Sequence, residues 1–211
     1  MDLIIHEEQE HRGYTCKVYY DPDPTSPNDW DTLGTIYSCH RDYNPQRHKM
    51  DEIIYWDEEG KWHVDENYIF VLIYFYEHSG IAIWSSRDTQ RCGWDSGLFG
   101  LMAVHKDKAA KEFGDMTNAE NYENAMKCLE AEVEEWNLYC KGEVYGFEVL
   151  DEDDCVIDSC WGYYGDEGAE EAMSEGIAII DNIVDKAEKE EAEYQAHVQL
   201  CERICEPFWI D

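Results

Sequence analysis

Nine polar and aromatic residues beside the most apolar stretch of the chain could bind a small ligand or transfer protons. Histidine and carboxylate groups near turns can act in acid–base chemistry, and aromatic rings can wall a pocket. A structural role is favoured, because turn Asp and Ser side chains bond their own backbone and no order of nucleophile, base and orienting group is evident. The set consists of Asp31, His40, Tyr43, Asn44, His78, Ser79, Trp94, Asp95 and Ser96.

The signatures of common enzyme classes are missing from the sequence. It contains no G-x-x-x-x-G-K-[ST], no G-x-G-x-x-G after a strand, no H-E-x-x-H and no G-x-S-x-G. These absences argue against NTPases, dinucleotide-binding enzymes, zinc proteases and α/β-hydrolases. We therefore expect no cofactor and no catalytic residue, and a binding protein is favoured over an enzyme.

The cysteines and an acidic turn are the possible metal ligands. Nine cysteines, an odd number without a C-x-x-C pair, favour reduced thiols in a cytosol over a disulfide framework. Neither Cys155 with Cys160 nor Cys201 with Cys205 is joined to a histidine at a usual zinc-ligand spacing. The run Asp151–Asp154 lacks the glycine and terminal glutamate of a calcium-binding loop, which favours a solvated turn. We expect no metal.

Acidity is the most distinctive property of the chain. The formal net charge is −33 and the sequence pI is about 4.3. Residues 67–114 are neutral, with five acids and five bases, whereas residues 115–211 have 28 acids and five bases. Such a field repels nucleic acid and anionic membranes and attracts the basic grooves in which other proteins hold DNA or RNA. Solubility or salt tolerance is the simpler alternative.

Acidic residues also recur at helical spacing. Residues four apart on a helix are stacked about 6 Å apart, so a row of carboxylates can imitate one edge of a DNA duplex. Like charges at this spacing destabilise a helix by roughly 0.2–0.5 kcal/mol per pair, which makes stability an unconvincing reason for them. A solvated outer face is the competing interpretation. The predicted partner-binding residues are Glu130, Glu134, Glu167, Glu171, Glu175, Asp181, Asp185 and Glu188.

Strands and turns must position these residues. The β-branched and aromatic run 68–76, a turn with Gly80, and residues 81–84 predict a hairpin in the middle of a sheet. Alternating residues 143–150 and 155–161 predict a second hairpin, and residues 14–20 and 33–40 predict further strands. The type of residues 46–67 stays open.

Two segments have the periodicity of amphipathic helices. Thr117 and Glu120 have the spacing of a capping box before an apolar stripe over 118–141. Residues 166–205 predict either one helix of about forty residues, roughly 60 Å long, or two helices broken near 186–191. We predict an α+β fold in which an antiparallel sheet built from hairpins packs on one face against these helices. Residues 1–165 would form the core domain and 166–211 an acidic helical segment packed on it.

Several motifs together carry a resemblance. They are Leu33-Gly-Thr35 with His40 and Tyr43-Asn44, Glu77–Gly80, Trp94–Gly97, and the stretches Glu132–Trp136, Gly142–Gly146 and Asp158–Gly165. The chain resembles, over about its middle two thirds, a family of small acidic proteins encoded by bacteriophages and mobile elements. The family has no established activity. The resemblance implies the cytoplasm of a bacterial host cell.

Three hypotheses of function follow. The first is an inhibitor that occupies the nucleic-acid-binding groove of a basic host defence protein by DNA mimicry, as anti-restriction or anti-CRISPR proteins do. It would bind neither nucleic acid nor membranes directly. The second is a small-ligand or nucleotide-binding protein, or an enzyme, that uses the polar set near the central hairpin. The third is a structural homodimer joined by the C-terminal helix, whose length exceeds the needs of a core helix.

Overall fold

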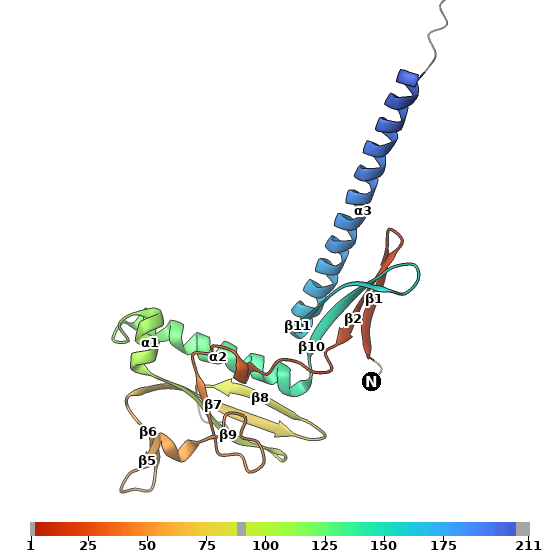
Figure 1. Cartoon of the computed structure of the whole chain (residues 1–211). Coiled ribbons are helices and arrows are strands. Elements are labelled where there is room, and N and C mark those ends of the chain that lie inside the picture. The colour runs from red at the N-terminus through yellow and green to blue at the C-terminus, as the bar shows by residue number, and fades with distance from the viewer. Residues whose placement is uncertain (1–2, 88–91, 206–211) are drawn as a thin grey trace, which may run out of the picture. The chain divides into compact units, whose positions relative to one another are not determined.

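The computed structural model describes residues 3–87 and 92–205, and it confirms the predicted α+β fold (Figure 1). The chain divides into two compact units. Unit 1 combines Met1–Pro22 with Tyr145–Asp211, and unit 2 is Asp23–Val144. This division differs from the expected one at residue 165, because the strand over residues 14–20 pairs with the strand over residues 144–150. The hairpins accordingly belong to two sheets, each with a helix of its own.

The sheet of unit 2 is built around the apolar stretch identified in the sequence. Its strand order is β4-β3-β9-β7-β8, so β9 and β7 have neighbours on both sides. All neighbours are antiparallel except β3 and β4. The predicted hairpin over 68–84 is present as β7 and β8. The strands are β3 (Thr35–Ser38), β4 (His48–Lys49), β7 (Tyr68–Glu77), β8 (Ile81–Ser86) and β9 (Ser96–His105).

One face of this sheet packs against helix α2 (Ala119–Lys141). The middle of the predicted stripe is buried, where Met126, Leu129, Val133 and Trp136 share a core cluster with alternate residues of β7 such as Val71. At the start of the helix, Tyr122 is 39% exposed. The helix begins one residue later than the expected capping box, because the side chain of Asn118 accepts from the first-turn amides in place of Thr117. It ends at Gly142, whose φ of 71° suits glycine. Helix α1 (Lys106–Phe113) precedes α2.

The other face is covered by the segment that the sequence left open. It contains a short 3-10 turn (Met50–Glu52) and the small hairpin of β5 (Ile54–Trp56) and β6 (Trp62–Val64). Another 3-10 turn, Pro27–Asp29, lies earlier in the chain, in the connection before β3. Met50 and Ile53 pack there against Leu72 and Tyr74 of β7. Both faces of β7 are therefore buried, which explains its continuous apolar run.

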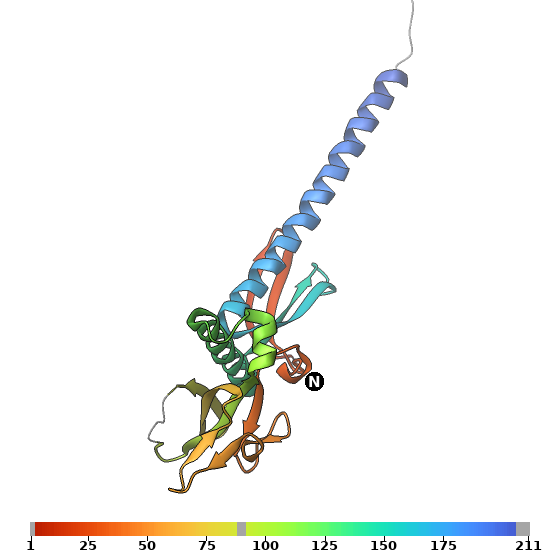
Figure 2. The same cartoon turned by 90° about the vertical axis from the view of Figure 1, so that its left-hand side faces the viewer.

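Unit 1 is a four-stranded sheet with one helix (Figure 2). Its order is β1-β2-β10-β11, and the predicted hairpin over 143–161 is present as β10 and β11. Residues of helix α3 such as Ala172 and Ile180 pack on Cys16, Val18 and Phe147. The elements are β1 (Ile5–His11), β2 (Tyr14–Tyr20), β10 (Val144–Leu150), β11 (Val156–Tyr164) and α3 (Gly165–Cys205).

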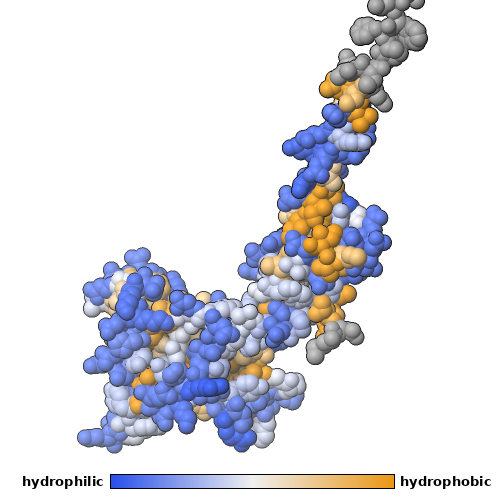
Figure 3. Space-filling view, viewed as in Figure 1, coloured by the Kyte–Doolittle hydropathy of each residue, from blue (hydrophilic) through white to orange (hydrophobic). Residues whose placement is uncertain are grey.

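Helix α3 is continuous over 41 residues, which decides between the two alternatives predicted from its sequence. At 1.5 Å per residue it is about 60 Å long. Residues up to Val184 include those that pack on the sheet, whereas residues 185–201 are exposed except for Val198. Figure 3 shows a hydrophilic band between the apolar residues near the sheet and a second apolar group towards the C-terminal end, where Leu200 is half-exposed.

Candidate functional site

Half of the predicted acidic row on α3 is held in ion pairs within unit 1. The guanidinium of Arg12, in the β1–β2 turn, donates to Asp181 at 3.0 Å, to Asp185 at 2.6 Å and to Glu188 at 3.0 Å. Nε2 of His11 lies 2.8 Å from Asp181, and His11 and then Arg12 lower the pKa of that carboxyl. These three carboxylates anchor the helix to the hairpin and are partly neutralised.

The N-terminal part of the row is freer. Tyr163 donates its hydroxyl hydrogen to Glu175 at 2.6 Å, and burial, with Cys160 and Glu175, raises the pKa of Tyr163. Glu167, Glu170 and Glu171 are exposed, and no ion pair reaches them from the described part of the chain. They form the free acidic set, the carboxylates of α3 best placed to meet a partner.

The two acids predicted on α2 belong to unit 2. Glu130 and Glu123 together clamp Arg87, with Nε 2.7 Å from Glu130 and Nη1 3.0 Å from Glu123. The carboxylates raise the pKa of Arg87, and Arg87 lowers the pKa of Glu123. Glu134 is exposed and accepts a hydrogen bond from Asn137. Of this pair, Glu134 retains the free charge that mimicry requires.

Charge is distributed unequally between the two units. Unit 1 has 25 acids and five bases, a net charge of −20 over 89 residues, and unit 2 has 24 acids and 11 bases, a net charge of −13 over 122 residues. Twelve of the acids of unit 1 lie on α3, beside three bases. The acidity is thus densest in the unit that contains the long helix.

Among the predicted pocket residues, His40 has a structural role. Its side chain is only 6% exposed and packs against Phe75 and Phe99, with ring centroids 4.5 Å and 5.6 Å away. The backbone amides of Asp42 and Tyr43 donate to its Nδ1 at 3.2 Å and 3.1 Å. This leaves Nε2 as the protonated nitrogen, 3.7 Å from Glu77, so the ring fixes the loop after β3.

The rest of the polar set is spread over several parts of unit 2. Asp95 and Ser79 adopt φ values of 63° in turns, and His78 lies 3.8 Å from Asp95. Trp94 is 92% exposed and does not line the five main pockets of the described residues. Asp31 lines a separate depression beside Lys108. Ser96 donates to the carbonyl of Gly93, and Tyr43 remains near His40.

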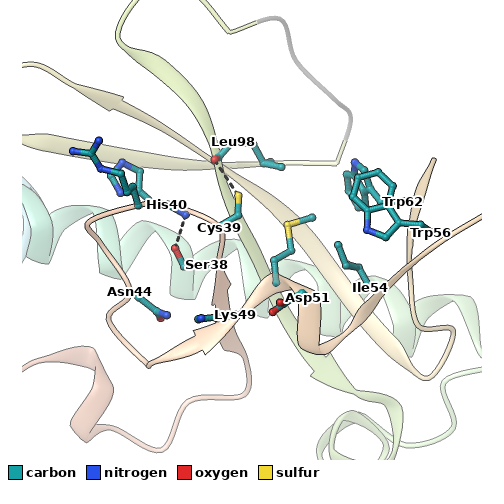
Figure 4. Close-up of a pocket in the computed structure, with 12 residues that line it drawn as sticks. Ser38, Cys39, His40, Asn44, Lys49, Asp51, Ile54, Trp56, Trp62 and Leu98 are labelled. Atoms are coloured by element: carbon teal, nitrogen blue, oxygen red, sulfur yellow. Dashed lines mark hydrogen bonds between the residues drawn. The ribbon is translucent and has the colours of Figure 1, made fainter. Parts of the chain in front are cut away.

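His40 and Asn44 do contribute to one substantial pocket, of about 590 Å³ (Figure 4). Sequence reasoning missed its other main groups, which are Lys49, Trp56 and Trp62. The two tryptophans flank the turn of residues 57–61 and are register partners in the small hairpin. An aromatic residue on each side of the short acidic, glycine-containing segment 57–61 was the signal that could have identified them.

The possible metal ligands gather nowhere in the described ranges, where no group of three or more His, Cys, Asp or Glu residues could hold an ion. Eight cysteines are free thiols there, and Cys205 has no described side chain. The Asp151 side chain accepts from the amides of Asp153 and Cys155, which is the bonding of an ordinary turn. Among the helices described, none has both the length and the apolar character to cross a membrane.

Comparisons of the chain with protein families, curated proteins and solved structures found no match. The resemblance to acidic phage proteins therefore stays a prediction, and function must be argued from the two features described above: the acidic surface of unit 1 and the pocket of unit 2.

Proposed function

We propose that the chain is an acidic inhibitor of phage or mobile-element type that occupies the nucleic-acid-binding groove of a basic bacterial host protein. The observation that carries this proposal is the net charge of −20 on the 89 residues of unit 1. A field of that sign and density draws in basic surfaces and repels nucleic acid itself. The setting in a phage or mobile element rests on the resemblance alone.

The spacing of charge sets how much of a duplex α3 can imitate. Twelve acids over about 60 Å amount to one per roughly 5 Å, whereas a duplex carries about one charge per 1.7 Å. The helix therefore reaches about a third of the duplex density, even before the pairs with Arg12 are discounted. It can stand in for one edge of a duplex, and the partner would be a protein that grips one strand closely.

The free acidic set gives the sharpest test. Changing its three glutamates to glutamine removes three charges at exposed positions and preserves side-chain size. A matched control removes three charges from the carboxylates that already bind Arg12. The test variant is Glu167→Gln, Glu170→Gln and Glu171→Gln, and the control is Asp181→Asn, Asp185→Asn and Glu188→Gln.

Each immobilised variant is exposed to a bacterial lysate, and bound proteins are eluted in a salt gradient. The wild type should retain a nucleic-acid-binding protein whose affinity falls steeply with salt, because both surfaces release counterions on binding. Exposed charge contacts contribute roughly 0.2–1 kcal/mol each, so the test variant should bind about threefold to a hundredfold more weakly. The control variant should lose less affinity for the retained protein. Equal losses would indicate that total charge, and not the free set, governs binding.

A further inference from the structure

The pocket of unit 2 combines cationic and aromatic groups in a protein whose surface is otherwise acidic. Its volume of about 590 Å³ lies within the range usual for sites that enclose a small ligand. Arg41 and Lys49 line it together with a single acid, Asp51. The net charge of the lining is therefore positive, which is opposite in sign to the charge of the whole chain.

Figure 4 shows that the pocket is polar at one end and aromatic at the other. Trp56 and Trp62 are partners across the small hairpin, so their rings project from the same face of it. Trp56 is 64% exposed and lines the pocket, so its indole ring is accessible to a ligand there. Indole faces stack on any planar base, since every base has a π-face.

The polar end has groups that the fold does not use. Lys49 takes part in no ion pair among the described residues, and Arg41 is paired only with its exposed neighbour Asp42. The amide oxygen of Asn44 is buried and accepts no hydrogen bond from any described residue. A buried acceptor without a donor is unfavourable, and a ligand hydroxyl or amino group would supply the donor.

We propose that this pocket binds a mononucleotide. The base stacks on Trp56 and Trp62, the phosphate lies at Lys49 and Arg41, and a ribose hydroxyl or base amino group donates to Asn44. Longer nucleic acids are disfavoured, because each further phosphate meets the repulsion of a chain of net charge −33. The site lies in unit 2 and does not depend on the acidic set of unit 1, so either proposal can fail without the other.

Isothermal titration of the full chain tests the assignment. AMP, GMP, CMP and UMP are each titrated, with the corresponding nucleosides and inorganic phosphate as separate ligands. At least one nucleotide should bind at a ratio of one to one, and its nucleoside should bind at least about tenfold more weakly. Absence of binding by all four nucleotides at millimolar concentration would overturn the proposal. So would a nucleoside that binds as tightly as its nucleotide.

Variants assign the two ends of the site. Lys49→Gln should weaken binding of the nucleotide about tenfold and leave binding of the nucleoside unchanged, whereas Trp56→Leu should weaken binding of both. The matched controls are Lys61→Gln, an exposed lysine of the same small hairpin, and Trp94→Leu, an exposed tryptophan outside the pocket. Both controls should stay within about twofold of the wild type. Equal effects of Lys49→Gln and Lys61→Gln would mean that net charge alone drives binding, which would refute the site. The substituted residues are exposed, so circular dichroism should show an unchanged fold.

Discussion

Replacing Glu132 by alanine should strongly destabilise unit 2. Glu132 lies on α2 and is only 8% exposed, and its carboxylate accepts from the amides of Leu33 at 2.5 Å and Gly34 at 2.8 Å. These amides begin the segment that leads into β3, and Leu33 and Gly34 are buried there. The carboxylate thus joins the helix to the start of β3 by two charge-assisted bonds.

The magnitude follows from the two bonds. A hydrogen bond to a charged group contributes roughly 1.5–3 kcal/mol, so Glu132→Ala should lower the free energy of unfolding by about 3–6 kcal/mol. Alanine recovers only a few tenths of a kcal/mol through its helix propensity. Glu132→Gln keeps one acceptor and places an N–H opposite the other amide, so it should cost about half as much. Either loss is large beside a typical domain stability of about 5–15 kcal/mol.

Urea denaturation and hydrogen exchange together provide the assay. Tryptophan fluorescence reports mainly the unfolding of unit 2, which contains six of the eight tryptophans, among them the buried Trp136 one turn along α2. Exchange of the amides of Leu33 and Gly34 reports the bonds themselves. The matched control is Glu134→Ala on the exposed face of the same helix, which should change stability by less than about 0.5 kcal/mol. A Glu132→Ala variant as stable as this control, with unchanged exchange, would refute the reasoning.

Three further outcomes are expected. Gly100→Ala should prevent β9 from pairing normally with β3, because the φ of Gly100 is 153° and an added Cβ would lie 2.1 Å from the carbonyl oxygen of Tyr37. Its melting temperature should fall, whereas that of the control Gly80→Ala should not, since the space around Gly80 is open. Burial raises the pKa of Cys16 to about 11, so its thiol should react with a thiol reagent at pH 8 at least tenfold more slowly than an exposed one, while the unfolded chain under anaerobic conditions should titrate all nine thiols. Because the pKa of Asp181 is lowered in the folded state, the ionised carboxylate stabilises the fold fully above its unfolded pKa of about 4, and this effect is lost as the pH falls through the folded pKa. Asp181→Asn should therefore lower the melting temperature at pH 6 and have little effect near pH 2.

The sequence predicted those elements that depend on local pattern. The stripe of α2 and the hairpin at Gly80 both depend on residues within a few positions of one another. The division into two sheets could not be predicted in this way. It depends on pairing between β2 and β10, which are more than 120 residues apart in the chain, and such pairing leaves no mark on local periodicity.

For the candidate site, too, features set by local pattern could be predicted and features set by long-range contacts could not. Exposed acids such as Glu167 were placed correctly on a helix face, because helical spacing alone determines it. The pairing of Arg12 with Asp185 joins residues far apart in the chain and could not be anticipated. Lys49 was overlooked because it is an ordinary lysine until the fold brings it into one pocket with Trp56.

Mutual exclusion with DNA tests the central claim most directly. The bacterial protein retained by the chain is bound to a labelled duplex, and the chain is added at moderate salt while fluorescence anisotropy and complex mass are followed. The chain should release the duplex stoichiometrically, and no ternary complex should form. The variant with glutamine at 167, 170 and 171 should need an at least threefold higher concentration to release the same amount of duplex. A ternary complex of chain, partner and duplex, or release of the duplex with equal potency by that variant, would contradict charge mimicry.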